Sequence, residues 1–155
     1  LLVVFTRHGS LLPDGRDLIA RRRSREDISL EASFGQSGHM AAIGSEGHQI
    51  IPRLSSRPNE LVLDKNTSSA FNSTAIDSYL RNLEISTLVV AGIATDMCVM
   101  TTSLDAADRG WNVFIASDAC ATIDPGMQEA VLLHFRRVFG RTPRTLEILS
   151  LLEGQ

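Results

Sequence analysis

Four short apolar runs recur along this chain, and they constrain its fold more than any other feature. The runs are rich in β-branched and aromatic residues, which is typical of buried strands. Segments with apolar residues at helical spacing follow them. Strands that alternate with helices predict βαβ units, a mostly parallel sheet and right-handed crossovers. The predicted strands are Leu1–Thr6, Leu61–Leu63, Thr87–Ala91 and Val113–Ala116; the predicted helices are Ser69–Leu83, Asp96–Arg109, Pro125–Arg137 and a last one from Thr142-Pro143 to about Leu152; the predicted loops include most of residues 28–60 and Asp118–Thr122.

The composition excludes several classes of function. A length of 155 residues fits one domain, and a formal net charge of −3 gives no basic footprint for a nucleic-acid partner. No apolar run approaches the roughly 20 residues that a membrane helix needs, so we expect no membrane partner. Two cysteines are too few for a disulfide scaffold, which favours a cytoplasmic protein with reduced thiols. One disulfide between Cys98 and Cys120 stays open as an alternative.

Chemically active side chains follow two of the predicted strands. Active sites of parallel sheets lie at the carboxyl ends of the strands, where this chain has Lys65 and the segment Gly92–Cys98. Cys98 falls on the first turn of a predicted helix that Thr95 or Asp96 could cap, and the N–H groups there favour a thiolate or hold an oxyanion. An ammonium at Lys65 could stabilise that thiolate. A buried core cysteine and a solvated lysine are the alternatives, but the two residues together favour a nucleophilic thiol.

Two segments carry a resemblance to a known superfamily. Gly92–Val99 reads Gly-Ile-Ala-Thr-Asp-Met-Cys-Val and resembles the nucleophile segment of the isochorismatase-like cysteine hydrolases. Lys65–Thr74, a Lys followed by Ser-Ala-Phe and a Thr, is similar to the lysine segment of the same superfamily. The resemblance implies a single hydrolase domain over 1–155 with a Rossmann-like, doubly wound α/β fold, its mostly parallel sheet covered by helices on both faces. Further matches are Thr102, Asp105-Ala106, Gly110 and Ser117-Asp118-Ala119.

The resemblance implies a nucleophilic mechanism on a small-molecule substrate. Cys98 would attack an amide, ureido or carbamoyl carbon to give a thioester-type intermediate that water hydrolyses, and Lys65 would be the second member of an Asp-Lys-Cys triad. The bond between Ile93 and Ala94 would be a cis peptide, and the N–H groups of Ala94 and Cys98 would form the oxyanion hole. No cofactor is implied, and the family commonly forms homo-oligomers. The implied substrate-binding residues are Arg7, Asn66 and Phe71; a salt bridge under the following loop is the alternative role of Arg7.

The triad Asp of the superfamily has no counterpart in this sequence. That Asp ends the family's first strand, whereas Leu1–His8 aligns better with the second strand, and Asp14 and Asp17 lie in a loop. We therefore expect a longer natural chain with an Asp-bearing strand; an inactive homologue is the alternative. The strands that would flank it, Leu2–Thr6 and Thr87–Ala91, should then either lie about 10 Å apart, which is two strand spacings, or be bridged by another chain. If they pair directly, the base must be sought among Asp64, Asp96 and Asp118.

Metal and substrate preferences rest on the same resemblance. The nicotinamidase branch binds a metal through an Asp and two His after the second strand, where this chain has Arg7 and a single His8, so we predict no metal. His39 and His48 are predicted to be loop or surface residues. The Thr-Arg end of the first visible strand and the Arg-rich segment 16–25 favour ureido and carbamoyl substrates. A nicotinamidase-type amidase is the second choice for the activity. An inactive homologue that binds a ligand or partner is the non-enzymatic alternative. Hydrolysis of a vinyl ether is disfavoured, because that chemistry needs no cysteine and Cys98 is present.

Overall fold

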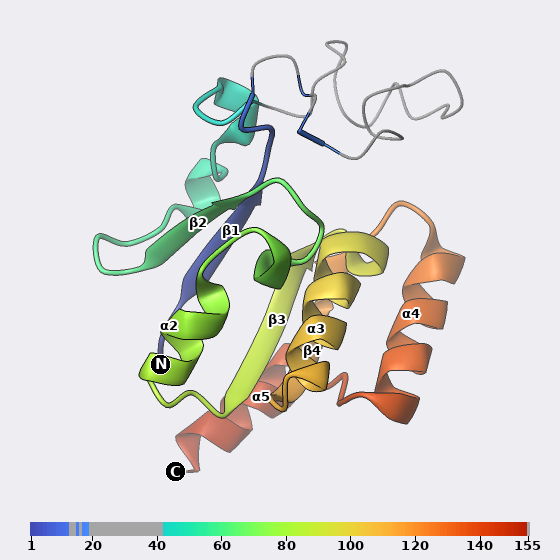
Figure 1. Cartoon of the computed structure of the whole chain (residues 1–155). Helices are drawn as coiled ribbons and strands as arrows, with labels where there is room; N and C mark the ends of the chain where they lie inside the picture. Colours follow the sequence, from blue (N-terminus) through green and yellow to red (C-terminus); the bar gives the residue numbers. More distant parts are fainter. Residues whose placement is uncertain (13–14, 16, 19–41, 155) are drawn as a thin grey trace. The chain divides into compact units, whose positions relative to one another are not determined.

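Two compact units make up the chain, and each contains its own pair of parallel strands. The computed structural model describes residues 1–12, 15, 17–18 and 42–154. Contacts divide it into Leu1–Thr74 and Ala75–Gln155, called unit 1 and unit 2 below (Figure 1). The Arg-rich segment 16–25, apart from positions 17 and 18, and His39 lie outside the described residues. Helices and parallel strands alternate as the sequence predicts, so the α/β class is confirmed.

Four strands form two separate parallel pairs. In the part of the chain that the structure describes, the first strand pairs only with the second and the third only with the fourth. The strands are β1, Val4–His8; β2, Leu61–Lys65; β3, Thr87–Ile93; and β4, Asn112–Ala121.

Unit 1 holds the regular pair, β1 and β2. Its register runs without interruption from Val4 beside Leu61 to His8 beside Lys65. Both strands extend further toward their carboxyl ends than the apolar pattern predicts, because Arg7-His8 and Asp64-Lys65 continue the ladder although they are polar. Lys65 is thus the last residue of its strand rather than a residue in the following loop. Short 3₁₀ turns precede β2, at Glu46–His48 and Pro52–Leu54.

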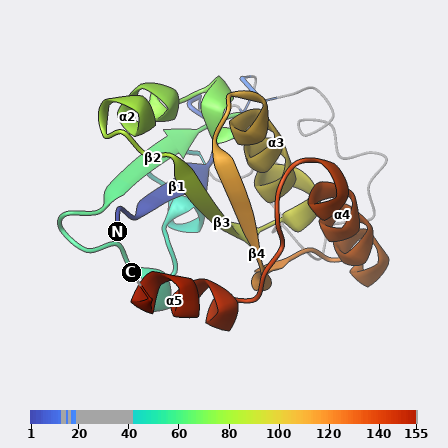
Figure 2. The same ribbon diagram turned by 90° about the horizontal axis from the view of Figure 1, so that it is seen from below.

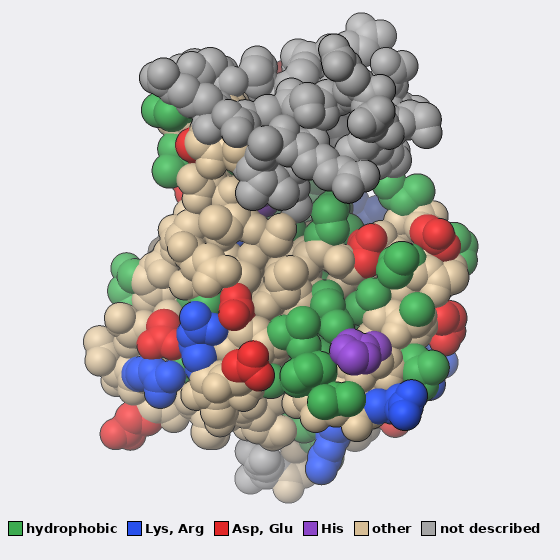
Figure 3. Space-filling model, turned by 45° about the vertical axis from the view of Figure 1, so that its right-hand side comes forward, with side chains coloured by type: hydrophobic (Ala, Val, Ile, Leu, Met, Phe, Trp, Pro, Cys, Tyr) green, Lys and Arg blue, Asp and Glu red, His purple; other side chains and the backbone are tan. Residues whose placement is uncertain are grey.

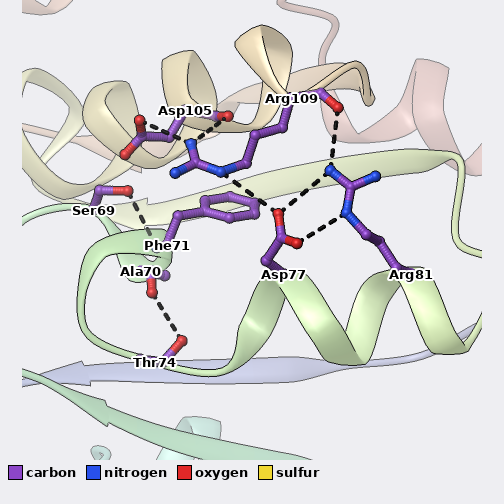
Figure 4. A network of polar contacts seen from close by, with 8 residues as sticks. All are labelled: Ser69, Ala70, Phe71, Thr74, Asp77, Arg81, Asp105 and Arg109. Atoms are coloured by element: carbon purple, nitrogen blue, oxygen red, sulfur yellow. Dashed lines mark hydrogen bonds and ion pairs between the residues drawn. The ribbon is translucent and has the colours of Figure 1, made fainter.

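The predicted helix Ser69–Leu83 is wrong in its first part. Residues Ala70–Asn72 form a 3₁₀ turn, in which the Ser69 hydroxyl accepts a hydrogen bond from the Phe71 N–H at 3.2 Å and the Thr74 hydroxyl donates to the Ala70 carbonyl at 2.8 Å (Figure 4). Such side-chain bonds to nearby backbone compete with helix formation. The helix itself, α2, is Ile76–Asn82 and belongs to unit 2.

Unit 2 covers its strand pair with helices on both faces, as a doubly wound fold requires. Figure 2 shows β4 between α3 and α4 on one side and α5 on the other. Its core side chains are almost fully buried, among them Ala106, Val113, Ile115 and Phe135. The helices are α3, Met100–Asp108, preceded by a π-turn over Thr95–Val99; α4, Pro125–Val138; and α5, Thr145–Glu153.

A break in register distinguishes β4 from the regular strands. Val90 pairs with Ile115, but Gly92 pairs with Cys120. Between these two pairings the chain advances five residues along β4 and only two along β3. The predicted loop over Asp118–Thr122 is therefore wrong for residues 118–121, which are strand. Residues 141–143 run along the other edge of β4, where the Ile115 N–H donates to the Arg141 carbonyl at 2.8 Å. The local sequence hides this strand because its apolar pattern stops at the bulge.

Polar contacts fix the starts of the last two helices. Asp124 caps α4 by accepting the N–H groups of Gly126 and Met127 at 2.7 and 3.1 Å, and Pro125 opens the helix as predicted. The last helix starts at Thr145 rather than at the predicted Thr142-Pro143, because the Asp118 carboxylate in the bulge accepts both the N–H and the hydroxyl of Thr145, at 2.7 and 2.9 Å. The Asp118 contact acts together with a local cap, in which the Glu147 carboxylate accepts the Arg144 N–H at 2.7 Å, to fix where α5 begins.

Ion pairs join α2 to the end of α3 within unit 2. Asp77 contacts Arg81 at 2.9 Å and Arg109 at 3.5 Å, and Arg109 also contacts Asp105 at 3.0 Å (Figure 4). The Arg81 guanidinium lies 4.6 Å from the centre of the Trp111 ring. These partly exposed contacts fix α2 against the loop that leads into β4.

The surface of unit 2 is partly apolar. Figure 3 shows hydrophobic side chains gathered on the side of α3 and α4. The exposed hydrophobic residues of unit 2 include Ile123 before α4 and Met127, Leu133 and Val138 on α4. No helix among the described residues combines the length and the hydropathy that crossing a bilayer demands.

Candidate active site

Cys98 lies directly after β3, at the edge where the sequence predicts chemistry. The strand ends at Ile93, and the peptide bond between Ile93 and Ala94 is cis, as the resemblance implies. Gly92 just before it has a φ of +121°, a conformation that side chains other than glycine rarely adopt. The Cys98 side chain is half-buried.

The turn that carries Cys98 is a π-turn and not the first turn of an α-helix. The Ala94 carbonyl accepts the N–H of Met97 at 3.1 Å and that of Val99 at 3.2 Å, and Met100 bonds back to Thr95 in the same manner. The prediction that Thr95 or Asp96 caps the helix is wrong, because Ala94 occupies the cap position and no side chain caps the turn. Such π-turns are frequent at functional sites.

Two threonine hydroxyls hold this turn. The Thr101 hydroxyl donates to the Met97 carbonyl at 2.7 Å, and the Thr122 hydroxyl donates to the Asp96 carboxylate at 2.5 Å. Sequence reasoning missed both contacts. The position of Asp96, two residues before Cys98, could have marked it as a support of the turn. Nothing in the local sequence indicates that Thr122 lies beside Asp96.

The second cysteine differs from the first in its surroundings. Burial raises the pKa of the Cys120 thiol, a hydrogen bond from the Gly92 backbone opposes this, and the Asp118 charge adds to the increase. The Cys120 sulfur lies 3.9 Å from the Val90 carbonyl oxygen, which fits the predicted packed structural thiol. Neither Cys98 nor Cys120 is in a disulfide, so the alternative of a bond between them is excluded.

Lys65, in unit 1, is a buried residue and not a solvated one. It is 2% exposed, and its Nζ donates to the carbonyl oxygens of Thr67 and Ser68 at 3.0 and 2.8 Å. It is also the only lysine of the sequence. A buried ammonium is costly unless polar groups surround it. The chain after β2 therefore folds back to supply acceptors for this one charge.

Asn66, the residue after Lys65, contacts the carboxylate of Asp17, which sequence reasoning set aside as a loop residue. The Asn66 amide donates to the Asp17 carboxylate at 3.3 Å. Asp17 also accepts the Ser10 hydroxyl and the Leu11 N–H, the latter at 2.8 Å. Partial desolvation raises the pKa of Asp17, but these hydrogen bonds outweigh it and hold the pKa well below its usual value. Phe71, the other predicted substrate contact of this segment, is 8% exposed.

Arg7 is engaged in the salt bridge that was its alternative role. Its Nε lies 2.8 Å from the Asp64 carboxylate, and the two residues are register partners in β1 and β2. Because side chains alternate along a strand, Asp64 and Lys65 point to opposite faces of this pair, and Arg7 lies on the Asp64 face. It lines an open hollow there with Gln49, Ile50, Ser55, Ser56 and Val62.

His48 corrects the prediction of a surface histidine. Its side chain is fully buried, with Nε2 at 3.6 Å from the same Asp64 oxygen that Arg7 contacts. Burial lowers the pKa of His48, the Asp64 charge opposes this and the Arg7 charge adds to the decrease. The 3₁₀ turn over Glu46–His48 carries the ring inward, which the loop-like composition of this region does not reveal.

The described residues do not fit a metal ion. No group of three or more His, Cys, Asp and Glu side chains within 1–12, 15, 17–18 and 42–154 could hold one. His48 and Asp64 come together, but the Arg7 guanidinium already occupies the cation position beside this carboxylate. His134 on α4, a conceivable partner for a cysteine, packs edge-on against Phe139 instead, with 5.7 Å between ring centres.

Each unit thus gathers its own share of the predicted site residues. Unit 2 brings Ala94 and Cys98 into one turn, and unit 1 places Asn66 directly after Lys65, with Arg7 on the opposite strand face. The three carboxylates considered as alternative bases are all engaged: Asp64 by Arg7, Asp96 by Thr122 and Asp118 by Thr145.

Comparisons with known proteins agree on one family. The family model of the isochorismatase domain matches residues 2–147. Nicotinamidase 3 of Arabidopsis thaliana is 30% identical over 135 residues, which cover 85% of this chain and 61% of that protein. The ureidoacrylate amidohydrolase RutB of Methylorubrum extorquens is 34% identical over 102 residues, which cover 65% of this chain and 41% of that protein. The chain therefore spans less than two thirds of either relative.

Solved structures give the same result. An isochorismatase family protein from Desulfovibrio vulgaris superposes with a TM-score of 0.78 at 26% identity, covering 99% of this chain and 76% of the other. N-carbamoylsarcosine amidase from Thermoplasma acidophilum superposes with a TM-score of 0.68 at 27% identity, covering 93% of this chain and 72% of the other.

Proposed function

The chain belongs to the isochorismatase family, and on that premise we propose that it is a hydrolase that cleaves a C–N bond of a small amide, ureido or carbamoyl compound with Cys98 as the nucleophile. The observation that carries the proposal is the half-buried Cys98 thiol in a π-turn directly after β3. Cys120 is half-buried as well, but it lies within β4 rather than in such a turn, and burial raises its pKa.

The proposed reaction has two steps. The Cys98 sulfur, after losing its proton, attacks the carbonyl carbon, and the resulting tetrahedral oxyanion collapses by breaking the C–N bond. The amine or ammonia leaves with the proton, and an acyl or carbamoyl thioester stays on Cys98. Water then attacks the same carbon, the C–S bond breaks, and the acid is released with the thiol restored. The N–H groups of Ala94 and Cys98 are the proposed oxyanion donors.

The role of Lys65 is a proposal carried by the family resemblance. As the second member of the triad it would stabilise the thiolate or orient the base that deprotonates it. The burial of its ammonium supports this role, because burying a charge is costly and strongly perturbed ionisable groups cluster at functional sites. Asn66, Phe71 and Arg7 are the proposed substrate contacts, and a homo-oligomer is the proposed assembly, to be tested by light scattering.

The names of the relatives favour a substrate class without selecting one compound. A ureidoacrylate amidohydrolase and an N-carbamoylsarcosine amidase are among the similar proteins, which supports a ureido or carbamoyl substrate. The similar nicotinamidase covers more of this chain, 85% against 65%, and so supports nicotinamide hydrolysis as the second candidate. We rank it second because Arg7 stands where the sequence of the nicotinamidase branch would have a metal ligand.

A substrate panel tests the proposal. Purified protein is incubated with ureido, carbamoyl and nicotinamide compounds, and ammonia release is measured beside the Cys98→Ser variant, before and after exhaustive chelation. We expect turnover of a ureido or carbamoyl compound, absent in the variant and unchanged by chelation. Stoichiometric zinc or iron that is lost together with nicotinamide hydrolysis would establish the second candidate. Binding of these compounds without turnover would establish the non-enzymatic alternative.

A further inference from the structure

A short hydrogen bond joins the Cys98 turn to the end of β4. The Thr122 hydroxyl donates to the Asp96 carboxylate at 2.5 Å, and both side chains are half-buried. Asp96 is the second residue of the π-turn and Thr122 is the first residue after β4. The contact therefore links two elements that are 26 residues apart in sequence.

The turn needs a lateral support of this kind. Its amino-terminal cap position is Ala94, which has no side-chain acceptor, so the start of the turn lacks the usual cap. A carboxylate at Asp96 would ordinarily be available to the backbone N–H groups nearby. Here the Asp96 carboxylate instead accepts the hydroxyl of Thr122, the first residue after β4. The hydroxyl of Thr101, which follows Cys98 in the chain, holds the Met97 carbonyl.

The break in register of β4 is what brings Thr122 to this place. Before the break Val90 pairs with Ile115, and the same offset continued would set Ser117 opposite Gly92. After the break Gly92 pairs with Cys120 and Ile93 with Ala121, so Thr122 comes next, beside the residues that lead into the Cys98 turn. The bulge thus delivers a hydroxyl to the carboxylate of Asp96.

We infer that Asp96 and Thr122 are positioning residues for Cys98. Their hydrogen bond fixes the π-turn against the end of β4 and so sets the direction in which the thiol is presented. The inference rests on the proposed function for its kinetic consequence and deepens it by naming what orients the nucleophile. A misplacement of about 1 Å at a reacting group can cost on the order of 100-fold in rate.

Two substitutions of Thr122 separate positioning from general stability. Thr122→Val keeps the shape of the side chain but removes the donor, whereas Thr122→Ser keeps the donor. The matched control is Thr145→Val, because Thr145 makes the same type of bond to the Asp118 carboxylate at 2.9 Å, away from the Cys98 turn. Asp96→Ala removes the acceptor of the same bond and serves as a second variant if Thr122→Val does not fold.

Two readouts are measured on each folded variant. The first is kcat and KM on the substrate found by the panel, and the second is the rate at which iodoacetamide alkylates Cys98, with Cys120 as the internal reference in the same sample. We expect Thr122→Val to lower kcat by about 10- to 100-fold with KM changed less than about twofold, and to change the Cys98 alkylation rate several-fold. Asp96→Ala should show the same losses as Thr122→Val, whereas Thr122→Ser and Thr145→Val should stay close to the unmodified protein in both readouts.

The two readouts keep this inference separate from the proposed function. Wild-type values of kcat and Cys98 alkylation in Thr122→Val would overturn the inference, and so would equal losses in Thr122→Ser or Thr145→Val. If no compound of the panel is cleaved, the proposed function fails, and the alkylation rates alone decide whether Thr122 positions the thiol.

Discussion

The two parallel strand pairs present their polar residues in different ways. In unit 1 the register of β1 and β2 is uninterrupted, and Lys65 at its carboxyl end is 2% exposed and held by two backbone carbonyls. In unit 2 the register of β3 and β4 breaks, and Cys98 follows in a π-turn with a half-buried thiol. A regular ladder accompanies the buried charge of Lys65, and an irregular one accompanies the half-buried thiol of Cys98.

The difference has a physical basis. A buried ammonium is stabilised by several fixed acceptors, and a regular strand followed by a tight return of the chain supplies them at Thr67 and Ser68. A nucleophile has to be reached by its substrate, so its turn must leave the side chain accessible while its backbone stays fixed. The bulge in β4 and the contact between Asp96 and Thr122 meet that requirement.

Replacing the nucleophile gives the largest expected effect. Cys98→Ser and Cys98→Ala should lower turnover by several powers of ten while the fold persists, as is common when a catalytic nucleophile is lost. Cys120→Ser is the control and should retain most activity, because Cys120 lies inside β4. Steady-state kinetics and circular dichroism check both expectations. Retained turnover in either variant would show that Cys98 is not the nucleophile. The contrast between a buried charge in unit 1 and a nucleophile in unit 2 would then fail.

The next effect concerns Lys65. Lys65→Met keeps the length of the side chain but leaves the Thr67 and Ser68 carbonyls without their donor, at a cost of about 1–3 kcal/mol for each buried group. We also expect kcat to fall by about 100-fold or more, because the Cys98 thiolate would lose the charge that is proposed to stabilise it. Urea unfolding and activity per folded molecule separate the two effects. Full activity per folded molecule would make Lys65 purely structural.

Gly92 in unit 2 has a positive φ, so it should tolerate substitution less well than a glycine with a negative φ. Gly92 has a φ of +121° with no atom within 4 Å of the position that a Cβ would take, so Gly92→Ala adds backbone strain and no collision. We expect a loss of about 1–3 kcal/mol in the free energy of unfolding. Gly154→Ala is the control, because Gly154 has an ordinary φ of −86°. Equal stabilities of the two variants would show that the β3 end is not constrained.

The two cysteines should differ in reactivity toward iodoacetamide at neutral pH. Burial and the Asp118 charge raise the pKa of Cys120, so less of its thiolate is present, and its sulfur is packed within the sheet. We expect Cys98 to be alkylated about tenfold faster or more, as measured by peptide mass spectrometry. Lys65→Ala should slow the reaction at Cys98 and leave Cys120 unchanged. Equal labelling of both thiols would contradict the contrast drawn for Cys98.

The smallest effect is a dependence of stability on acid. The backbone N–H and hydroxyl of Thr145, with the Arg144 charge, lower the pKa of Asp118 despite partial desolvation. A carboxyl with a lowered folded pKa stabilises the fold above its unfolded pKa of about 3.9, and this is lost as the pH falls through the folded value. Asp118→Asn should therefore flatten the decline of thermal stability below about pH 4. An unchanged pH profile in this variant would remove the role of Asp118 at α5.

The helices and strands that the sequence predicted correctly are those whose signals are local. Pro125 after Asp124 marks the start of α4, the β-branched run from Thr87 marks β3, and both appear where expected. The segments Lys65–Thr74 and Gly92–Val99 likewise identified the family, because their residues are contiguous. Local propensity and short motifs act over a few residues, so a single sequence shows them without any knowledge of the packing.

Tertiary structure decided the features that depend on residues far apart in the chain. The burial of His48 comes from its approach to Asp64, the start of α5 at Thr145 from Asp118, and the support of the Cys98 turn from Thr122. In each case the free energy of a polar group depends on a partner that only the folded chain brings near. The sequence by itself determined the α/β class and the family, and the packing determined how the predicted site residues are held.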